Sequence, residues 1–296
     1  MWVASFFFER IHMSAKELIK DHLDKLAETL LEIKDSLGIP LYEGKSKCLY
    51  ATNDPNVYRM VFKDDITSGD GEKKETLLNK GSLNQTTSKR IYEYLHSCPT
   101  GLAEGRSSRR YDTEIATHYI SSPFINEQLV KKLDIIPVEV IIRNFAAGSF
   151  CKRYGIKKGH KFNTPLLELF YKDDDLNDPL CGENVVTEMG WCDHHKLAEI
   201  KRQAYILNHH MQEFWSSFEL VLVDQKFEFG IDSEGNIMLA DEITCDSQRL
   251  WDKDGKSLDK DIFRQGDSMN QVSDVYKYIH NLIGADSVNV TRTLKE

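Results

Sequence analysis

The 296-residue sequence has no apolar run that approaches the ~18 residues of a membrane-spanning helix, so no membrane partner is expected. Its six cysteines form no C-x-x-C pair, and the first eight residues lack the basic segment and cleavage site of a signal peptide. These absences favour reduced thiols in a cytoplasmic protein. Lys and Arg number 38 against 47 Asp and Glu, and the net charge of −9 argues against nucleic-acid binding.

Several catalytic motifs are also missing. There is no G-x-x-x-x-G-K-[ST] phosphate loop, and no G-x-G-x-x-G follows a predicted strand. The absence of G-x-S-x-G leaves little support for a covalent hydrolase. Two histidine pairs, at 194–195 and 209–210, fall on a predicted helix, where adjacent side chains diverge and form poor metal clusters.

Helix and strand patterns are mixed in the sequence, without repeats or a β-α-β rhythm, which favours an α+β fold. Apolar spacing predicts helices over 14–36, 82–95, 193–218 and 272–283, the third beginning after an Asp193 cap. Alternating or β-branched patterns predict strands over 45–52, 57–62, 138–143, 220–231 and 237–243.

The predicted strand 220–231 carries three charges at period two. Asp224, Lys226 and Glu228 therefore share one face of that strand. A run of alternating charges is also typical of a polar strand that faces solvent, so the pattern alone leaves both interpretations open.

The turn at 232–236 predicts how this strand pairs with the next. If Asp232 pairs with Ile237, Glu228 lies directly opposite Asp241, and the two carboxylates repel unless a positive charge lies between them. A divalent cation would resolve that conflict. Mg²⁺ favours one or two carboxylates together with phosphate oxygens, so the hairpin is a candidate metal–nucleotide site. A shifted register is the alternative.

Three further segments are candidates for phosphate or substrate contacts. Lys45 and Lys47 lie on one strand face and suit a polyphosphate, although a solvated edge strand has the same pattern. The strand ending at Arg143 leads into a small-residue turn with Ser149, which suits a phosphate unless the arginine pairs with a surface carboxylate. The acidic segment 64–71 is either a substrate loop or a turn.

Five segments in this order resemble the SAICAR synthetase family, from about residue 41 nearly to the C-terminus. They are LYEGKSK at 41–47, TSGDG at 67–71, PVEVIIRNFAAGS at 137–149, VDQKFEFG at 223–230, and DEITCDSQRLWD at 241–252. The sequence departs from the family pattern in one of them, because Cys245 stands where a proline is expected, which predicts a less rigid loop around Asp246.

The resemblance implies a two-lobed α+β fold, similar to ATP-grasp proteins and kinases, with an N-terminal antiparallel β lobe and a larger mixed α/β lobe. It divides the chain into a helical extension at 1–38, a small nucleotide-binding β-rich lobe at 39–130, and a larger lobe with the metal and ribotide sites at 131–296. The extension lies outside the resemblance, and it has two interpretations, lobe packing or self-association into a homodimer.

The activity implied by the resemblance is an ATP-dependent ligation in de novo purine biosynthesis. In that family ATP phosphorylates the carboxylate of carboxyaminoimidazole ribotide (CAIR), and the amine of L-aspartate displaces the phosphate to give SAICAR, ADP and phosphate. The implied cofactors are ATP and Mg²⁺, and the partners are these small-molecule substrates.

The resemblance also implies residue roles. The implied catalytic residues are Lys45, Lys226, Glu228 and Asp241, and the last two would also bind Mg²⁺. The implied ATP-binding residues are Lys45, Lys47, Leu49, Lys132, Leu133, Glu228 and Asp241. The implied substrate-binding residues are Arg143, Ser149 and Arg249 at the ribotide phosphate, Asp246 at the imidazole, and Asp70 in the loop that would contact aspartate.

Two other classes of function share part of this pattern. A small-molecule kinase uses the same lysines and carboxylates but stops after phosphoryl transfer, so it would make ADP without aspartate. A non-catalytic nucleotide-binding scaffold would leave ATP intact with every substrate present. The acidic hairpin argues against the scaffold.

Overall fold

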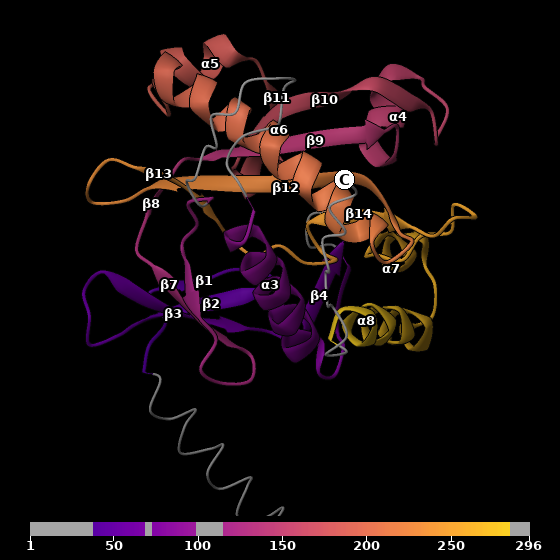
Figure 1. Cartoon of the computed structure of the whole chain (residues 1–296), viewed down its shortest axis with the longest axis horizontal. Coiled ribbons are helices and arrows are strands. Elements are labelled where there is room, and N and C mark those ends of the chain that lie inside the picture. Colours follow the sequence, from indigo (N-terminus) through magenta and orange to yellow (C-terminus); the bar gives the residue numbers. More distant parts are fainter. Residues whose placement is uncertain (1–37, 69–72, 99–114, 285–296) are drawn as a thin grey trace, which may run out of the picture.

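The protein is described here by a computed structural model that covers residues 38–68, 73–98 and 115–284 (Figure 1). The predicted helix over 14–36 and Asp70 lie outside the described residues. The described residues form two large antiparallel sheets, a separate two-stranded hairpin and the helices packed around them, and this confirms the α+β class predicted from the sequence. No helix in the described ranges is long and apolar enough to cross a membrane.

The smaller sheet is formed mainly by the N-terminal part of the chain. Its strand order is β1 (Tyr42–Glu43), β2 (Lys47–Ala51), β3 (Val57–Phe62), β7 (Glu127–Lys131) and β6 (Tyr119–Ser121). The Asp54 carboxylate accepts a 2.8 Å hydrogen bond from the Asn56 amide in the turn between β2 and β3, which confirms the predicted hairpin. A separate hairpin joins β4 (Asp65–Ser68) and β5 (Lys73–Thr76).

The larger sheet is built around one long strand. Its order is β11 (Leu180–Cys181), β10 (Lys161–Tyr171), β9 (Val138–Phe145), β12 (Val221–Ile231) and β13 (Ile237–Ala240). Strands β8 (Asp134–Ile135) and β14 (Gln248–Trp251) also pair with β12. Four strands therefore take their register from β12, which carries the predicted charged face.

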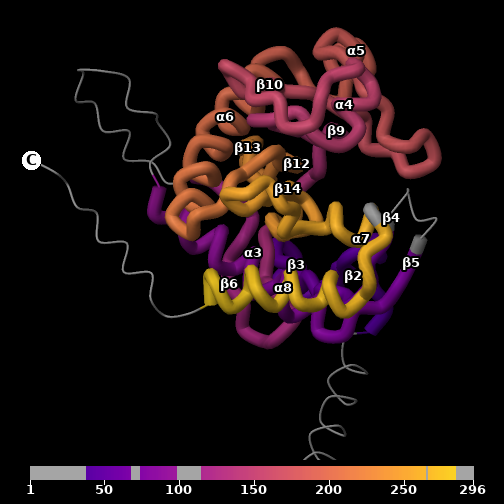
Figure 2. Tube along the Cα trace, turned by 90° about the vertical axis from the view of Figure 1, so that its right-hand side faces the viewer, coloured from indigo at the N-terminus to yellow at the C-terminus, as the bar shows by residue number. Residues whose placement is uncertain are grey.

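Three long helices cover the sheets. Helix α6 (His194–Ser216) crosses the larger sheet (Figure 1), and it begins where the Asp193 carboxylate accepts a 2.8 Å bond from the Lys196 amide, as predicted. Helix α3 (Lys80–His96) packs on the smaller sheet, and α8 (Met269–Gly284) lies against α3 (Figure 2). The shorter helices are α4 (Gly148–Tyr154), α5 (Glu183–Glu188) and α7 (Asp261–Gln265). The C-terminal helix thus packs against a helix of the segment proposed as the small lobe.

The register of the β12–β13 hairpin differs from the prediction by one residue. Ile231, and not Asp232, pairs with Ile237, so Glu228 lies opposite Ala240. All five residues from 232 to 236 form the turn, because the Asp232 carboxylate accepts hydrogen bonds from the Glu234 and Asn236 amides. The predicted pairing of Glu228 with Asp241 across the ladder is therefore wrong.

Residues 132 and 133 connect the two sheets, as they lie between β7 of the smaller sheet and β8, which pairs with β12. The backbone passes very close to β12 at this point. A Cβ atom placed on Gly230 would lie 2.7 Å from the Leu133 Cβ and 3.1 Å from the Asp134 carbonyl oxygen. Only glycine allows this approach, so Gly230 sets the position of the connection.

Gly230→Ala is expected to reduce the free energy of unfolding by about 1–3 kcal/mol, because the added methyl group must displace the Leu133 backbone. Urea denaturation followed by circular dichroism measures this. Gly182→Ala is the matched control, since φ is −90° there and no heavy atom lies within 4 Å of a Cβ. Equal stability of the Gly230 variant and the wild type would contradict the proposed close packing.

Candidate active site

A cleft of about 490 Å³ lies between the two sheets. Part of its lining is apolar, and this part comes from the smaller sheet, the connection and β8: Leu49, Met60, Val130, Leu133 and Ile135. The rest is strongly charged and comes from both sheets: Lys45, Lys47, Lys172, Lys226, Glu228, Asp241 and Glu242. An apolar wall beside a charged one suits a ligand with a flat base at one end and phosphates at the other.

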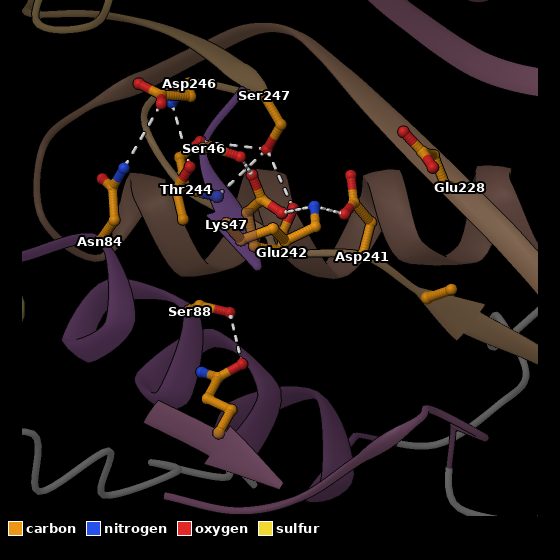
Figure 3. Close-up of polar contacts among 12 residues, drawn as sticks. Ser46, Lys47, Asn84, Ser88, Glu228, Asp241, Glu242, Thr244, Asp246 and Ser247 are labelled. Atoms are coloured by element: carbon orange, nitrogen blue, oxygen red, sulfur yellow. Dashed lines mark hydrogen bonds and ion pairs between the residues drawn. The ribbon is translucent and has the colours of Figure 1, made fainter. Parts of the chain in front are cut away.

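Lys47 joins the two sheets across the cleft. Its ammonium group lies between the carboxylates of Asp241 and Glu242 and forms an ion pair with each (Figure 3). Burial raises the pKa of Glu242, but the charge of Lys47 lowers it by a larger amount, so the pKa lies well below its usual range. Lys45, nearer the surface, pairs with Asp174 at 2.8 Å.

Glu228 lies between two further ammonium groups. Lys226 is 2.6 Å from one carboxylate oxygen, and Lys172 forms an ion pair with the other. Burial raises the pKa of Glu228, but the charges of Lys226, Lys172 and Lys47 outweigh burial and lower it to about 2. Lys226 also lies 3.8 Å from Asp241. Lysines therefore supply the positive charge between the two carboxylates.

Asp246 also lines the cleft, and its carboxylate is held by one side chain from each of the helices α3 and α8. Lys80 at the start of α3 is fully buried, and its ammonium group lies 2.6 Å from the Asp246 carboxylate. The Tyr276 hydroxyl of α8 donates to the other carboxylate oxygen. Burial raises the pKa of Asp246, but the charges of Lys80 and Lys260 lower it to about 2. Asp246 thus presents an ionised carboxylate to the cleft, although no proline stiffens its loop.

The predicted ribotide residues form a second cluster beside the cleft. Arg143 donates to Glu168 at 2.6 Å and to Asp224 at 2.8 Å, and Arg249 binds the same Asp224 at 3.0 Å. Arg249 also donates to Asp261 at 2.8 Å. Asp224 thus bridges the two arginines. This arrangement does not confirm a phosphate-binding role for Arg143, and it is not the predicted alternative either, because the paired carboxylates are buried and do not lie at the surface.

The turn before α4 lies against this cluster. A Cβ atom on Gly148, at φ +55°, would lie 2.4 Å from an Arg249 guanidinium nitrogen. Ser149 follows in the first turn of α4 and is exposed. The cluster contains four arginines against three carboxylates, counting Arg153 and Arg264 with Arg143 and Arg249 against Glu168, Asp224 and Asp261.

Most of the predicted site residues come together. Those that line the cleft are Lys45, Lys47, Leu49, Leu133, Lys226, Glu228, Asp241 and Asp246. Those outside its lining are Lys132, beside Leu133 in the connection, and Arg143, Ser149 and Arg249 in the second cluster. Thr67 of the predicted aspartate loop also lines the cleft, whereas Asp70 lies outside the described residues.

Sequence patterns missed several residues of the cleft. Lys80 contacts Asp246 across 166 positions of sequence, and no local pattern indicates that partner. Lys172 lies between the end of β10, which was not predicted, and an acidic run, a position that also suits a surface turn. Glu242 could have been suspected from the sequence, because it is adjacent to Asp241 in the segment 241–252. In the structure its carboxylate also forms an ion pair with Lys47.

The carboxylates can be compared with what Mg²⁺ requires. Among the described residues, no three side chains of His, Cys, Asp or Glu are arranged to hold a metal by themselves. Mg²⁺ bound with a nucleotide needs only one or two carboxylates, because phosphate oxygens and water complete its shell. Glu228 and Asp241 both approach Lys226 and so share one part of the cleft. This donor set fits a metal that arrives with a nucleotide.

Comparison with known proteins agrees with this geometry. The model of the SAICAR synthetase family matches residues 40–281. Over 239 residues the chain is 41% identical to the phosphoribosylaminoimidazole-succinocarboxamide synthase of Streptococcus pyogenes serotype M1, covering 81% of this chain and 95% of that protein.

Two solved structures have the same fold. The crystal structure of phosphoribosylaminoimidazole-succinocarboxamide synthase from Ehrlichia chaffeensis superposes with a TM-score of 0.75 at 36% identity, over 83% of this chain and 99% of that one. A SAICAR synthetase in complex with ADP gives a TM-score of 0.72 at 35% identity, over 82% and 96% of the two chains. By this agreement in sequence and structure, the chain belongs to the SAICAR synthetase family, the ATP-dependent ligases that act as phosphoribosylaminoimidazole-succinocarboxamide synthases in purine biosynthesis.

Proposed function

We propose that the cleft between the two sheets binds ATP with Mg²⁺ and is where L-aspartate is joined to the carboxylate of CAIR. The observation that carries this proposal is that a charged part and an apolar part of the lining adjoin in one cleft. Lysines of the smaller sheet face carboxylates of the larger sheet, and the apolar lining lies beside them. A relative with the same fold is solved in complex with ADP, which supports nucleotide binding by this chain.

The nucleotide is proposed to lie with its base against Leu49 and Leu133, and with its phosphates at Lys45 and Lys47. The backbone around Lys132 would meet the edge of the base. Phosphoryl transfer involves little covalent chemistry by the protein, so catalysis depends on position and on neutralised charge. Lys45, Lys47 and Lys226 supply that charge.

Glu228 and Asp241 are the residues that would hold Mg²⁺. When bound, the ion would draw electron density from the phosphate oxygens and so favour in-line transfer of the terminal phosphoryl group. Each carboxylate is now paired with lysines, and those ammonium groups would bind phosphate oxygens when the nucleotide is present.

The ribotide is proposed to bind across the cleft and the arginine cluster. Arg143, Arg249 and Ser149 would receive its phosphate, and the ionised carboxylate of Asp246 would accept hydrogen bonds from its imidazole amine. Asp224 of the cluster and Lys226 of the cleft lie two residues apart on β12, so the two sites adjoin. Asp70 is proposed to contact L-aspartate from the 67–71 loop.

The proposed reaction has two steps. ATP transfers its terminal phosphoryl group to the CAIR carboxylate, and the amine of L-aspartate then displaces phosphate from the acyl phosphate to form the amide. Water must be kept from the acyl phosphate, which a closed cleft would do.

All six cysteines are free thiols, which supports the proposed cytoplasmic location.

A set of drop-one reactions tests this proposal. Purified protein is mixed with ATP, Mg²⁺, CAIR and L-aspartate, and one component is omitted at a time while ADP and the succinocarboxamide are measured. The amide should form only in the complete mixture. Steady ADP formation without aspartate, with a stable phosphorylated product, would instead identify a kinase.

Glu228→Gln and Asp241→Asn are each expected to lower kcat at least ~100-fold, because each removes a charge from the proposed metal site at nearly constant volume. The Glu228 variant should also lose about 1–3 kcal/mol of stability, since partly exposed Lys226 and Lys172 lose their shared anion. Steady-state assays and thermal unfolding measure both effects. Glu183→Gln, which breaks an ion pair with Lys201 outside the cleft lining, is the control. Wild-type turnover in either cleft variant would exclude the metal assignment.

Arg249→Lys is expected to weaken CAIR binding about tenfold or more and to leave ATP affinity nearly unchanged, because an ammonium group cannot make two parallel bonds to a phosphate. Arg143 is less suitable, since only 2% of its side chain is exposed and its replacement would disturb Glu168 and Asp224. Arg264→Lys, which pairs with the same Asp261 as Arg249, is the matched control. Calorimetric titration of each ligand separates the outcomes, and a loss confined to ATP would reverse the proposed partition.

A further inference from the structure

Asp241 occupies an unusual backbone conformation at the edge of the cleft. Strand β13 ends at Ala240, and Asp241 follows with φ +65°, in the left-handed region that few residues other than glycine adopt. Such a conformation persists only where surrounding contacts hold it, and it is most informative next to a functional site.

The observed register shows what this conformation achieves. Glu228 lies opposite Ala240, so the side chains of these two residues share one face of the hairpin. Alternation along a regular strand would send the next side chain, that of Asp241, to the other face. Instead, the Asp241 carboxylate pairs with Lys47 (Figure 3). It also lies 3.8 Å from Lys226, the lysine that binds Glu228. The left-handed residue therefore returns the carboxylate to the cleft.

Two buried side chains hold the Asp241 carbonyl group. The His118 Nε2 atom lies 2.9 Å from that oxygen, and the Tyr92 hydroxyl donates to it as well. A carbonyl oxygen is only an acceptor, so the imidazole proton must be on Nε2. The oxygen has two lone pairs, and these two donors use both. Tyr92 comes from α3, and the His118 amide bonds to the Leu239 carbonyl, so both donors are anchored in the fold.

We infer that Tyr92 and His118 are positioning residues that hold Asp241 in its left-handed conformation, so that its carboxylate joins Glu228 in binding the metal–nucleotide complex. Neither side chain needs to contact substrate, since both act through the Asp241 backbone. This inference rests on the proposed function, in which Asp241 helps to hold Mg²⁺.

The test compares the affinity for ADP in excess Mg²⁺ with the affinity in a chelator, each measured by titration calorimetry. The ratio of the two affinities reports how well the carboxylates hold the metal with the nucleotide, without any turnover. Tyr92→Phe removes only the hydroxyl and keeps the ring, which stacks on Tyr119 at 5.3 Å. Tyr119→Phe is the matched control, because its hydroxyl contacts Ser122 at 3.3 Å and not Asp241.

Tyr92→Phe should reduce the Mg²⁺ ratio at least fivefold and leave the affinity in chelator within twofold of the wild type. The control should leave both unchanged. A second pair of variants bypasses any folding defect of the first: His118→Gln, which keeps an N–H donor, should retain more of the ratio than His118→Phe.

Two results would overturn the inference, and they are distinguishable. A lower unfolding temperature with an unchanged Mg²⁺ ratio in Tyr92→Phe and His118→Phe would show that these residues only stabilise the fold. If the wild-type protein binds ADP equally well in excess Mg²⁺ and in chelator, the proposed metal site is contradicted, and the inference is contradicted with it.

Discussion

The ion pairs that Lys47 makes with Asp241 and Glu242 are the interaction on which the cleft depends. Lys47 comes from the smaller sheet and both carboxylates follow β13 of the larger one, so these contacts join the two halves where ligand must enter. Largely buried charges are costly unless they are paired. The ion pairs that join the two sheets across the cleft are therefore made by the groups proposed to engage the nucleotide, so binding would exchange one set of charged partners for another.

Strand β12 links this cleft to the arginine cluster. Because side chains alternate along a strand, Asp224 reaches Arg143 and Arg249 while Lys226 and Glu228 reach the cleft from the same face. Neighbouring strands pair with β12 on both sides, and the close approach at Gly230 places the connection between the sheets. The spacing between the two proposed binding sites is thus a property of one strand and does not depend on a flexible loop.

The parts of this arrangement that are local in sequence could be predicted. Period-two alternation placed Lys226 and Glu228 together, and the Asp193 cap located the start of α6. The hairpin register could not be predicted, because it depends on whether Asp232 pairs or closes the turn with its side chain. Lys80 and Tyr276 were also missed, since their contacts with Asp246 connect elements that only the tertiary fold brings together.

Glu228 and Asp241 approach the same lysine in spite of the wrong register, and the reason is physical. A one-residue slip reverses the face of every later side chain in a regular strand, so the sequence argument for Glu228 and Asp241 should have failed with the register. The two carboxylates nevertheless reach the same part of the cleft, because β13 stops at Ala240 and the chain turns through a left-handed residue. Asp tolerates that region better than most residues, since its short side chain hydrogen-bonds locally. The residue type therefore serves two purposes at position 241, as an anion and as a residue that the turn accepts.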